Sequence, residues 1–137
     1  MTSDSEKTRE APSGSPIAAR LHSVVHASHG IWNLLRSEHN ARIHAFATLV
    51  VVLAGWVLGI DRSEWIAVVL AMTLVWMAEA LNTAVETLCD VVCPAEDPRI
   101  KKAKDVAAGS VLISAIGALA VGSFVFLPRL YCVVFVG

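Results

Sequence analysis

The sequence has little charge. Only 17% of its 137 residues are Asp, Glu, Lys or Arg, and 55% are hydrophobic, whereas soluble domains average about 25% charged residues. These proportions argue against a water-soluble domain. The eleven basic and twelve acidic residues give a formal net charge of −1, so the chain lacks the basic surplus with which proteins bind a phosphate backbone. We therefore expect no nucleic acid partner.

Metal-binding and nucleotide-binding motifs are also scarce. Cys89 and Cys93 stand four residues apart without the second ligand pair of a zinc site, so we interpret them as apolar filling. His22, His26 and His29 could bind zinc, but they form no His-Glu-x-x-His pattern and are expected to be surface imidazoles. The glycines form neither a Walker A loop nor a Gly-x-Gly-x-x-Gly turn, so any nucleotide must be held in another way.

The hydrophobic residues are collected in long blocks. Residues 43–60 contain one ionisable side chain, His44, and residues 106–127 contain none. As helices, these two blocks cover about 27 and 33 Å, enough to cross the hydrocarbon core of a bilayer. A third block begins at Trp65 and is interrupted by Glu79, but no Pro or Gly stops the helix before residue 92. The expected spans are residues 43–60, 65–92 and about 105–127.

The basic residues predict the orientation of these spans. Five of the eleven Lys and Arg residues precede the first span and four lie between the second and third. Nine therefore lie on one side, which the positive-inside rule makes cytoplasmic. No apolar signal-peptide core occurs in the first 42 residues, so we expect a multi-pass protein of the bacterial inner (cytoplasmic) membrane with its N-terminus inside.

The segment before the first span divides into two parts. Residues 1–16 are rich in Ser, Glu, Pro and Thr, which predicts a disordered tail. Residues 17–38 carry apolar side chains at helical spacing, which predicts an amphipathic helix that lies on the inner membrane surface or packs against the bundle. The predicted fold class is an all-α integral membrane protein, with three transmembrane helices plus an N-terminal amphipathic surface helix, in one domain over residues 17–137.

Small residues recur along the third span. Ser110, Ser114, Ala118 and Gly122 stand four apart, a spacing that lets helix backbones approach closely in lipid. The partner helix could belong to the same chain or to another copy. Because three spans make a thin bundle, we expect an oligomer.

Acidic residues follow one face of the second span. Glu86 and Asp90 each fall within about 20° of Glu79 around a helix, on opposite sides of it, with Asn82 and Thr83 beside them. A helix end that meets water explains Glu86 and Asp90, but not Glu79, because an acid in the membrane costs about 2.5–3.5 kcal/mol. Glu79 is therefore a functional candidate, and acids one or two turns apart could hold Mg²⁺.

A basic run lies in the connection between the second and third spans. Its members are Arg99, Lys101, Lys102 and Lys104. They would suit phosphate groups, but such a run can also set the topology or contact anionic lipid.

Specific motifs accompany these patterns. Residues 78–86 read Ala-Glu-Ala-Leu-Asn-Thr-Ala-Val-Glu, and Asp90 and then Ala103-Lys104-Asp105 follow. This combination resembles the prokaryotic diacylglycerol kinase family, which includes the undecaprenol kinases. Residues 30–38 and the triplet Arg42-Ile43-His44 fit the same family, so the resemblance covers roughly residues 20–130.

The resemblance implies a homotrimeric membrane kinase that transfers the γ-phosphoryl group of MgATP to a lipid alcohol at the cytoplasmic interface. Residues 17–137 would form the kinase domain. Glu79 matches the family's catalytic acid, which accepts the proton of the lipid hydroxyl. Glu38 and Glu86 match carboxylates that bridge Mg²⁺ and the nucleotide phosphates. Lys104 and Asp105 match family residues that contact the ATP phosphates and the polar network of the site. Asn82 and Asp90 match residues that support this network.

The resemblance also bears on the substrates. Arg42-Ile43-His44, residues 106–109 and Phe126-Leu127-Pro128 are more similar to undecaprenol kinases, so undecaprenol is favoured over diacylglycerol as the acceptor. Either acceptor would serve phospholipid or cell-envelope lipid-carrier metabolism. Residues 95–97 read Ala-Glu-Asp where members commonly carry Glu-Tyr-His, so nucleotide selectivity is not carried over. The alternative is an oligomeric proton or ion conductor that uses Glu79, although acids at the membrane boundary favour interfacial chemistry.

Overall fold

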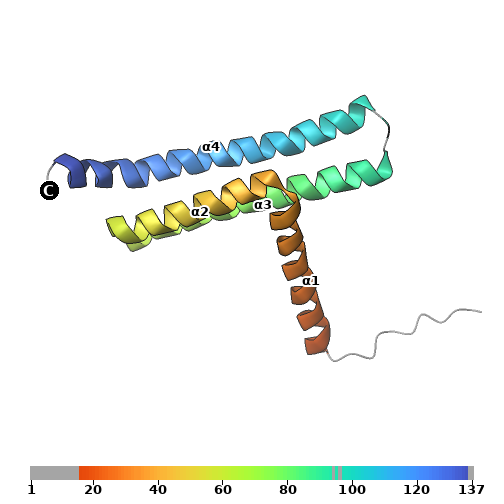
Figure 1. The fold of residues 1–137 in the computed structure, drawn as a ribbon, viewed down its shortest axis with the longest axis horizontal. Coiled ribbons are helices and arrows are strands. Elements are labelled where there is room, and N and C mark those ends of the chain that lie inside the picture. The colour runs from red at the N-terminus through yellow and green to blue at the C-terminus, as the bar shows by residue number, and fades with distance from the viewer. Residues whose placement is uncertain (1–15, 94, 96, 136–137) are drawn as a thin grey trace, which may run out of the picture.

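The computed structural model describes residues 16–93, 95 and 97–135. Four helices follow one another in this part of the chain: α1 (Pro16–Ser37), α2 (His39–Leu58), α3 (Arg62–Val92) and α4 (Pro98–Phe135) (Figure 1). The three later helices are long and apolar enough to cross a membrane, which confirms the three predicted spans. The predicted tail, residues 1–16, lies outside the described residues except for Pro16.

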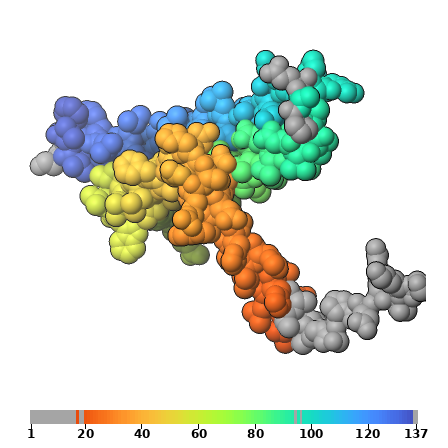
Figure 2. Space-filling view, turned by 45° about the vertical axis from the view of Figure 1, so that its right-hand side comes forward, coloured from red at the N-terminus to blue at the C-terminus, as the bar shows by residue number. Residues whose placement is uncertain are grey.

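The three long helices lie side by side, and α1 projects sideways from them where α2 begins (Figure 1). The α3–α4 hairpin has the most extensive contact of any helix pair. Leu34, near the end of α1, is buried, but Ile17, Leu21 and Val24 are exposed, and most of α1 stands clear of the other helices (Figure 2). Most of α1 is therefore not packed against the bundle within this chain.

The helix lengths divide the bundle into two zones. α2 has 20 residues, or about 30 Å, close to a hydrocarbon thickness. α3 and α4 have 31 and 38 residues, or about 46 and 57 Å. Their paired ends continue past the start of α2 (Figure 1). This two-helix extension carries Glu86, Asp90 and Lys104.

Several helix boundaries differ from those of the predicted segments. α2 begins at His39, before the predicted 43–60 segment, and ends at Leu58. The first predicted helix ends at Ser37 rather than at residue 38, because Glu38 has extended backbone angles (φ −95°, ψ 125°) and is the N-cap of α2. α3 begins at Arg62 instead of residue 65 because Asp61 and Glu64 form a capping box. Asp61 Oδ1 accepts from the Glu64 N–H at 3.0 Å, and Glu64 Oε2 accepts from the Asp61 N–H at 2.7 Å.

Helix α4 extends beyond the predicted third span, about residues 105–127, at both ends. α4 begins at Pro98, seven residues before the expected start at 105, because Pro suits the first position of a helix and the Asp97 carboxylate accepts from the Arg99 N–H at 2.8 Å. It also runs through Pro128 to Phe135 rather than ending at residue 127. Pro128 removes one backbone donor, a loss that membrane helices tolerate.

Arg129, the residue after Pro128, ties the end of α4 to the α2–α3 turn. Its Nη1 donates to the Gly59 carbonyl at 2.6 Å, and its Nη2 donates to Glu64 Oε2 at 2.6 Å. Gly59 adopts φ +59° as the C-cap of α2, a conformation that favours glycine. One arginine therefore joins three helices at this end of the bundle.

The buried cluster of the bundle lies near this turn. Ile60, Val68 and Val125 form its centre, and Trp65 packs against it. A Cβ on Gly55 would lie 2.8 Å from the Trp65 ring, so the absence of a side chain there lets α2 and α3 approach.

The small-residue stripe faces α3 of the same chain. Ser110, Ser114 and Ala118 line an apolar cavity of about 740 Å³ between α3 and α4. Gly122, the fourth predicted member, is not among the residues that line it. Three of the four stripe residues therefore lie along the groove between α3 and α4 of this chain.

Candidate active site

Glu79 is the most unusual side chain of the bundle. It lies on α3, is 1% exposed and is the largest fully buried side chain in the described part of the chain. Its Oε2 has no hydrogen-bond partner among the described residues. Burial of an unpaired carboxylate is costly, so the position of this acid is explained by chemistry better than by stability.

Two further acids interact electrostatically with the Glu79 carboxylate. They are Glu38 and Glu86. Glu86 lies two turns along the same helix, whereas Glu38 is brought in by the junction of α1 and α2, where it makes no side-chain cap hydrogen bond. The two predicted metal-binding carboxylates therefore lie around the predicted base.

Asn82 orients one of these acids. Its Nδ2 donates to Glu86 Oε1 at 3.1 Å, and the residue is 6% exposed. Its Oδ1 and the Thr83 hydroxyl are buried without partners in the described chain, as is Glu79 Oε2. Buried polar atoms are rarely unpaired in native proteins, so these three atoms within five residues are candidates to bind a ligand or another polar group.

Asp90 and Lys104 form the next part of the site. Lys104 Nζ lies 2.9 Å from Asp90 Oδ1, and the two side chains are 37% and 69% exposed. A pair this exposed adds about 0–1 kcal/mol of stability, so its main effect is to hold the Lys104 ammonium group beside Asp90. Glu86 also interacts electrostatically with Lys104.

Asp105 completes this region. It is exposed and, with Asp90 and Lys104, lines a cavity of about 590 Å³ between the end of α3 and the start of α4. Two of the predicted nucleotide-contacting residues, Lys104 and Asp105, thus share one cavity, whereas Glu38 and Glu86 do not line it.

The remaining basic residues do not join the acidic face. Arg99 Nη2 pairs with Asp97 Oδ2 at 2.8 Å, and the hydrogen bonds from Arg99 lower the pKa of the Asp97 carboxyl. Lys101 and Lys102 are exposed. Within the basic run, Lys104 therefore pairs with an acid of α3, whereas Arg99 pairs with Asp97 beside the start of α4.

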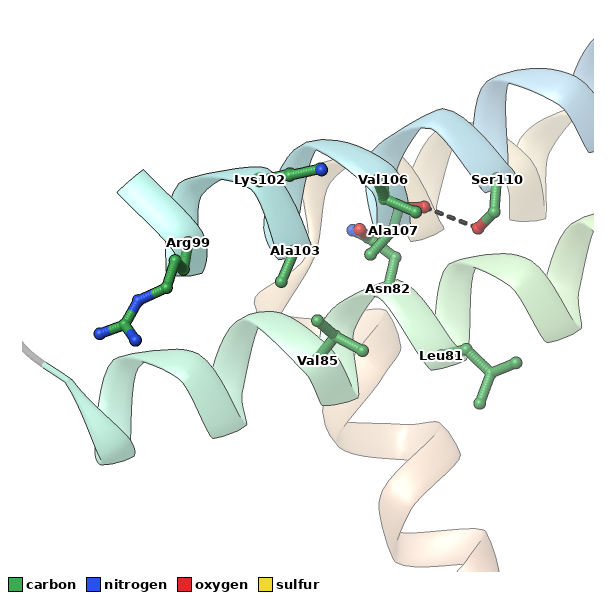
Figure 3. A pocket seen from close by; sticks show the side chains of 9 residues that line it. All are labelled: Leu81, Asn82, Val85, Arg99, Lys102, Ala103, Val106, Ala107 and Ser110. Atoms are coloured by element: carbon green, nitrogen blue, oxygen red, sulfur yellow. Dashed lines mark hydrogen bonds between the residues drawn. The ribbon is translucent and has the colours of Figure 1, made fainter. Parts of the chain in front are cut away.

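A second cavity lies between the two helices of the extension. It has a volume of about 660 Å³ and is almost wholly apolar. Figure 3 shows Asn82 pointing from α3 toward Ala107 of α4, while the Arg99 guanidinium points away from the cavity. This cavity and the 740 Å³ cavity share Leu81 and Ser110, so an apolar groove follows the α3–α4 hairpin.

The metal-binding capacity of the site is limited. Among the described residues, no group of three or more His, Cys, Asp or Glu side chains is placed to hold a metal ion. Glu38 and Glu86 still suit Mg²⁺, because this ion commonly uses one or two protein carboxylates and completes its shell with water and phosphate oxygens. His22, His26 and His29 are exposed on α1, as predicted.

The cysteines are free in the structure. Cys89 is buried, as expected for an apolar filler, but Cys93 is half-buried and Cys132 is exposed.

The interpretation of the sequence overlooked one neighbour of the site. His44 Nε2, on α2, lies 3.9 Å from Glu79 Oε2. A signal was present, because His44 is the only ionisable residue between 43 and 60.

Comparisons with known proteins identify the family. The family model of prokaryotic diacylglycerol kinase matches residues 25–126, which include every candidate site residue. The undecaprenol kinase of Bacillus subtilis (strain 168) is 37% identical over 108 residues, which cover 79% of this chain and 88% of that protein. The diacylglycerol kinase of Synechocystis sp. (strain ATCC 27184 / PCC 6803 / Kazusa) is 35% identical over 102 residues, which cover 74% of this chain and 58% of that protein. The chain belongs to the prokaryotic diacylglycerol kinase family and is a membrane-embedded lipid kinase of the diacylglycerol/undecaprenol kinase type.

Proposed function

We propose that this kinase transfers the γ-phosphoryl group of ATP to the hydroxyl of a membrane lipid alcohol in a Mg²⁺-dependent reaction. The observation that carries the proposal is the buried, unpartnered Glu79 carboxylate with Glu38 and Glu86 around it. Phosphoryl transfer depends on positioning and charge neutralisation, and acids of this kind can supply both a proton acceptor and a metal site.

Each residue has a distinct role in this proposal. Glu79 accepts the hydroxyl proton as the lipid oxygen attacks the γ-phosphorus and ADP leaves. Glu38 and Glu86 would hold Mg²⁺, which neutralises charge on the phosphates when bound. Lys104 and Asp105 contact the nucleotide phosphates, and the cavity that they line together supports this role. Asn82 holds Glu86, and Asp90 holds Lys104.

The arrangement in the membrane follows from α1. Its exposed residues Ile17, Leu21 and Val24, together with its sideways projection (Figure 1), support a surface helix at the lipid–water boundary. Glu38, at the end of α1, interacts with Glu79, so the base lies near the same boundary. There it meets a hydroxyl whose apolar tail stays in the bilayer. We assign this side to the cytoplasm of the bacterial inner membrane on the positive-inside rule, with residues 17–137 as the kinase domain and residues 1–16 as a disordered tail.

The active form is proposed to be a homotrimer. Within one chain, α2 and α4 leave many large apolar side chains exposed, and three polar atoms of the site lack partners. Neighbouring copies would cover part of the apolar surface and could complete the site.

Undecaprenol is the favoured acceptor and diacylglycerol the second. The Bacillus subtilis undecaprenol kinase supports this order, because the match covers 88% of that protein and only 58% of the Synechocystis diacylglycerol kinase. The purified protein should be assayed in mixed micelles with labelled ATP, Mg²⁺ and each lipid in turn. Preferential labelling of undecaprenol is expected. A clear preference for diacylglycerol would reverse the order, and labelling of neither lipid would contradict the proposal.

A further inference from the structure

His44 lies beside the proposed base. It is on α2, its side chain is 18% exposed, and its Nε2 is 3.9 Å from Glu79 Oε2. This separation is longer than a hydrogen bond, for which N···O is about 2.7–3.2 Å. A small change of side-chain torsion in either residue would close it.

The His44 imidazole is itself held in place. Its ring stands edge-on to Trp76, with centroids 6.5 Å apart and planes inclined by 65°. The Trp76 indole N–H donates to Thr48 Oγ1 at 3.1 Å. Thr48 lies one turn after His44 on α2, and Trp76 lies one turn before Glu79 on α3. The four side chains therefore form one bridge between the two helices.

His44 differs from the other two side chains that interact with Glu79, because those two are acids. Three groups interact with the Glu79 carboxylate electrostatically: His44, Glu38 and Glu86. The two glutamates repel a negative charge, whereas the imidazole attracts it. Glu79 Oε2 has no hydrogen-bond partner among the described residues, so a donor from His44 would satisfy an otherwise unpaired atom.

We propose that His44 positions Glu79 by donating a hydrogen bond from Nε2 to Oε2, which fixes the carboxylate for proton abstraction from the lipid hydroxyl. The inference rests on the proposed role of Glu79 as the base. It requires only an Nε2–H donor, which both the neutral tautomer with that proton and the protonated imidazole provide. His44 acts through Glu79 and is a positioning residue.

Donor-preserving substitutions test this role. His44→Leu removes the donor and should lower kcat by about 100-fold, the scale of a misplaced catalytic group, without a matching rise in KM for ATP. His44→Gln places an amide N–H near the Nε2 position and should recover most of the lost rate. His44→Asn places its amide nearer the Nδ1 position and should not. His29→Leu, on α1, is the matched histidine control and should behave as wild type.

Three kinetic results would overturn the inference: His44→Leu with wild-type kcat, His44→Gln and His44→Leu equally impaired, or His44→Asn as active as His44→Gln. If His44→Leu does not fold, the Gln and Asn variants still decide, because they differ only in the reach of the donor.

A spectroscopic measurement separates this inference from the proposed function. The infrared carboxyl band of Glu79, identified by its loss in Glu79→Gln, should shift in His44→Leu and stay in place in His29→Leu. This holds even if the wild-type protein phosphorylates no lipid, an outcome that would contradict the proposed function alone. A Glu79 band that is unchanged in His44→Leu would contradict the hydrogen bond.

Discussion

At the scale of single residues, identical side chains on α3 have different surroundings. Glu79 is enclosed by the bundle, whereas Glu86 is half-buried and receives a hydrogen bond from Asn82. Helical periodicity placed both acids on one face, and the cost of an acid in lipid singled out Glu79. Glu86, beyond the apolar part of the helix, is free to meet a cation and phosphate groups.

Substitution of Glu86 tests its proposed metal role. Glu86→Gln keeps the size of the side chain and its bond to Asn82 but removes the charge. We expect the Mg²⁺ concentration for half-maximal activity to rise by about 10-fold or more, since loss of a carboxylate ligand weakens a hard-cation site. Glu86→Asp keeps the carboxylate and should remain closer to wild type. An unchanged Mg²⁺ titration for Glu86→Gln would contradict the assignment.

At the scale of elements, hydrophobic periodicity alone could not predict where the helices begin and end. The capping box of Asp61 and Glu64 starts α3 earlier than its apolar block does. The predicted third span ends at residue 127, yet α4 continues through Pro128 to Phe135, because a proline removes only one backbone hydrogen bond. Arg129 then anchors this last segment to Gly59 and Glu64.

The Arg129 contacts predict a stabilising role. Arg129→Met keeps a long apolar stem but loses the bonds to the Gly59 carbonyl and the Glu64 carboxylate. Hydrogen bonds to charged groups contribute about 1.5–3 kcal/mol, and partial exposure of the guanidinium places the expected loss at about 2 kcal/mol or less. Thermal unfolding in detergent measures it. The control is Arg62→Met, an exposed arginine of the same turn, and equal stability of both variants would contradict the anchor.

At the scale of the whole molecule, the distribution of basic residues and the lengths of the helices agree on which side of the membrane the polar extension lies. The basic residues set the predicted orientation, and the excess length of α3 and α4 over α2 puts the polar extension on the side where most of those residues lie. Composition alone could predict a membrane bundle with this asymmetry. It could not predict the sideways projection of α1, which depends on the extended backbone of Glu38 between two helices.

The orientation can be checked with single cysteines. Arg62→Cys, in the α2–α3 turn, should react with a membrane-impermeant maleimide in intact cells when the three native cysteines are replaced. Cys93, kept as the sole cysteine, should react only after the membranes are opened. The positive-inside pattern is the physical reason for this difference. Labelling of Cys93 in intact cells would contradict the orientation.

The candidate site shows where prediction from sequence ends. Helical spacing could predict that Glu79, Glu86 and Asp90 share one face of a helix. The family motifs predicted three further site residues: Glu38, Lys104 and Asp105. The pairing of Lys104 with Asp90 depends on the turn between α3 and α4. The approach of His44 to Glu79 depends on the packing of α2 against α3. Neither contact follows from the spacing within one helix.

The most direct test of the account compares wild type with Glu79→Gln in the lipid phosphorylation assay, with assembly checked by size-exclusion chromatography. Gln keeps the shape of the side chain but cannot accept the hydroxyl proton. Because general base catalysis contributes about 10²–10⁴-fold, we predict a loss of that size in kcat with an intact assembly. Substantial activity in Glu79→Gln, with the same lipid and the same Mg²⁺ dependence as wild type, would contradict the assignment of Glu79 as the base.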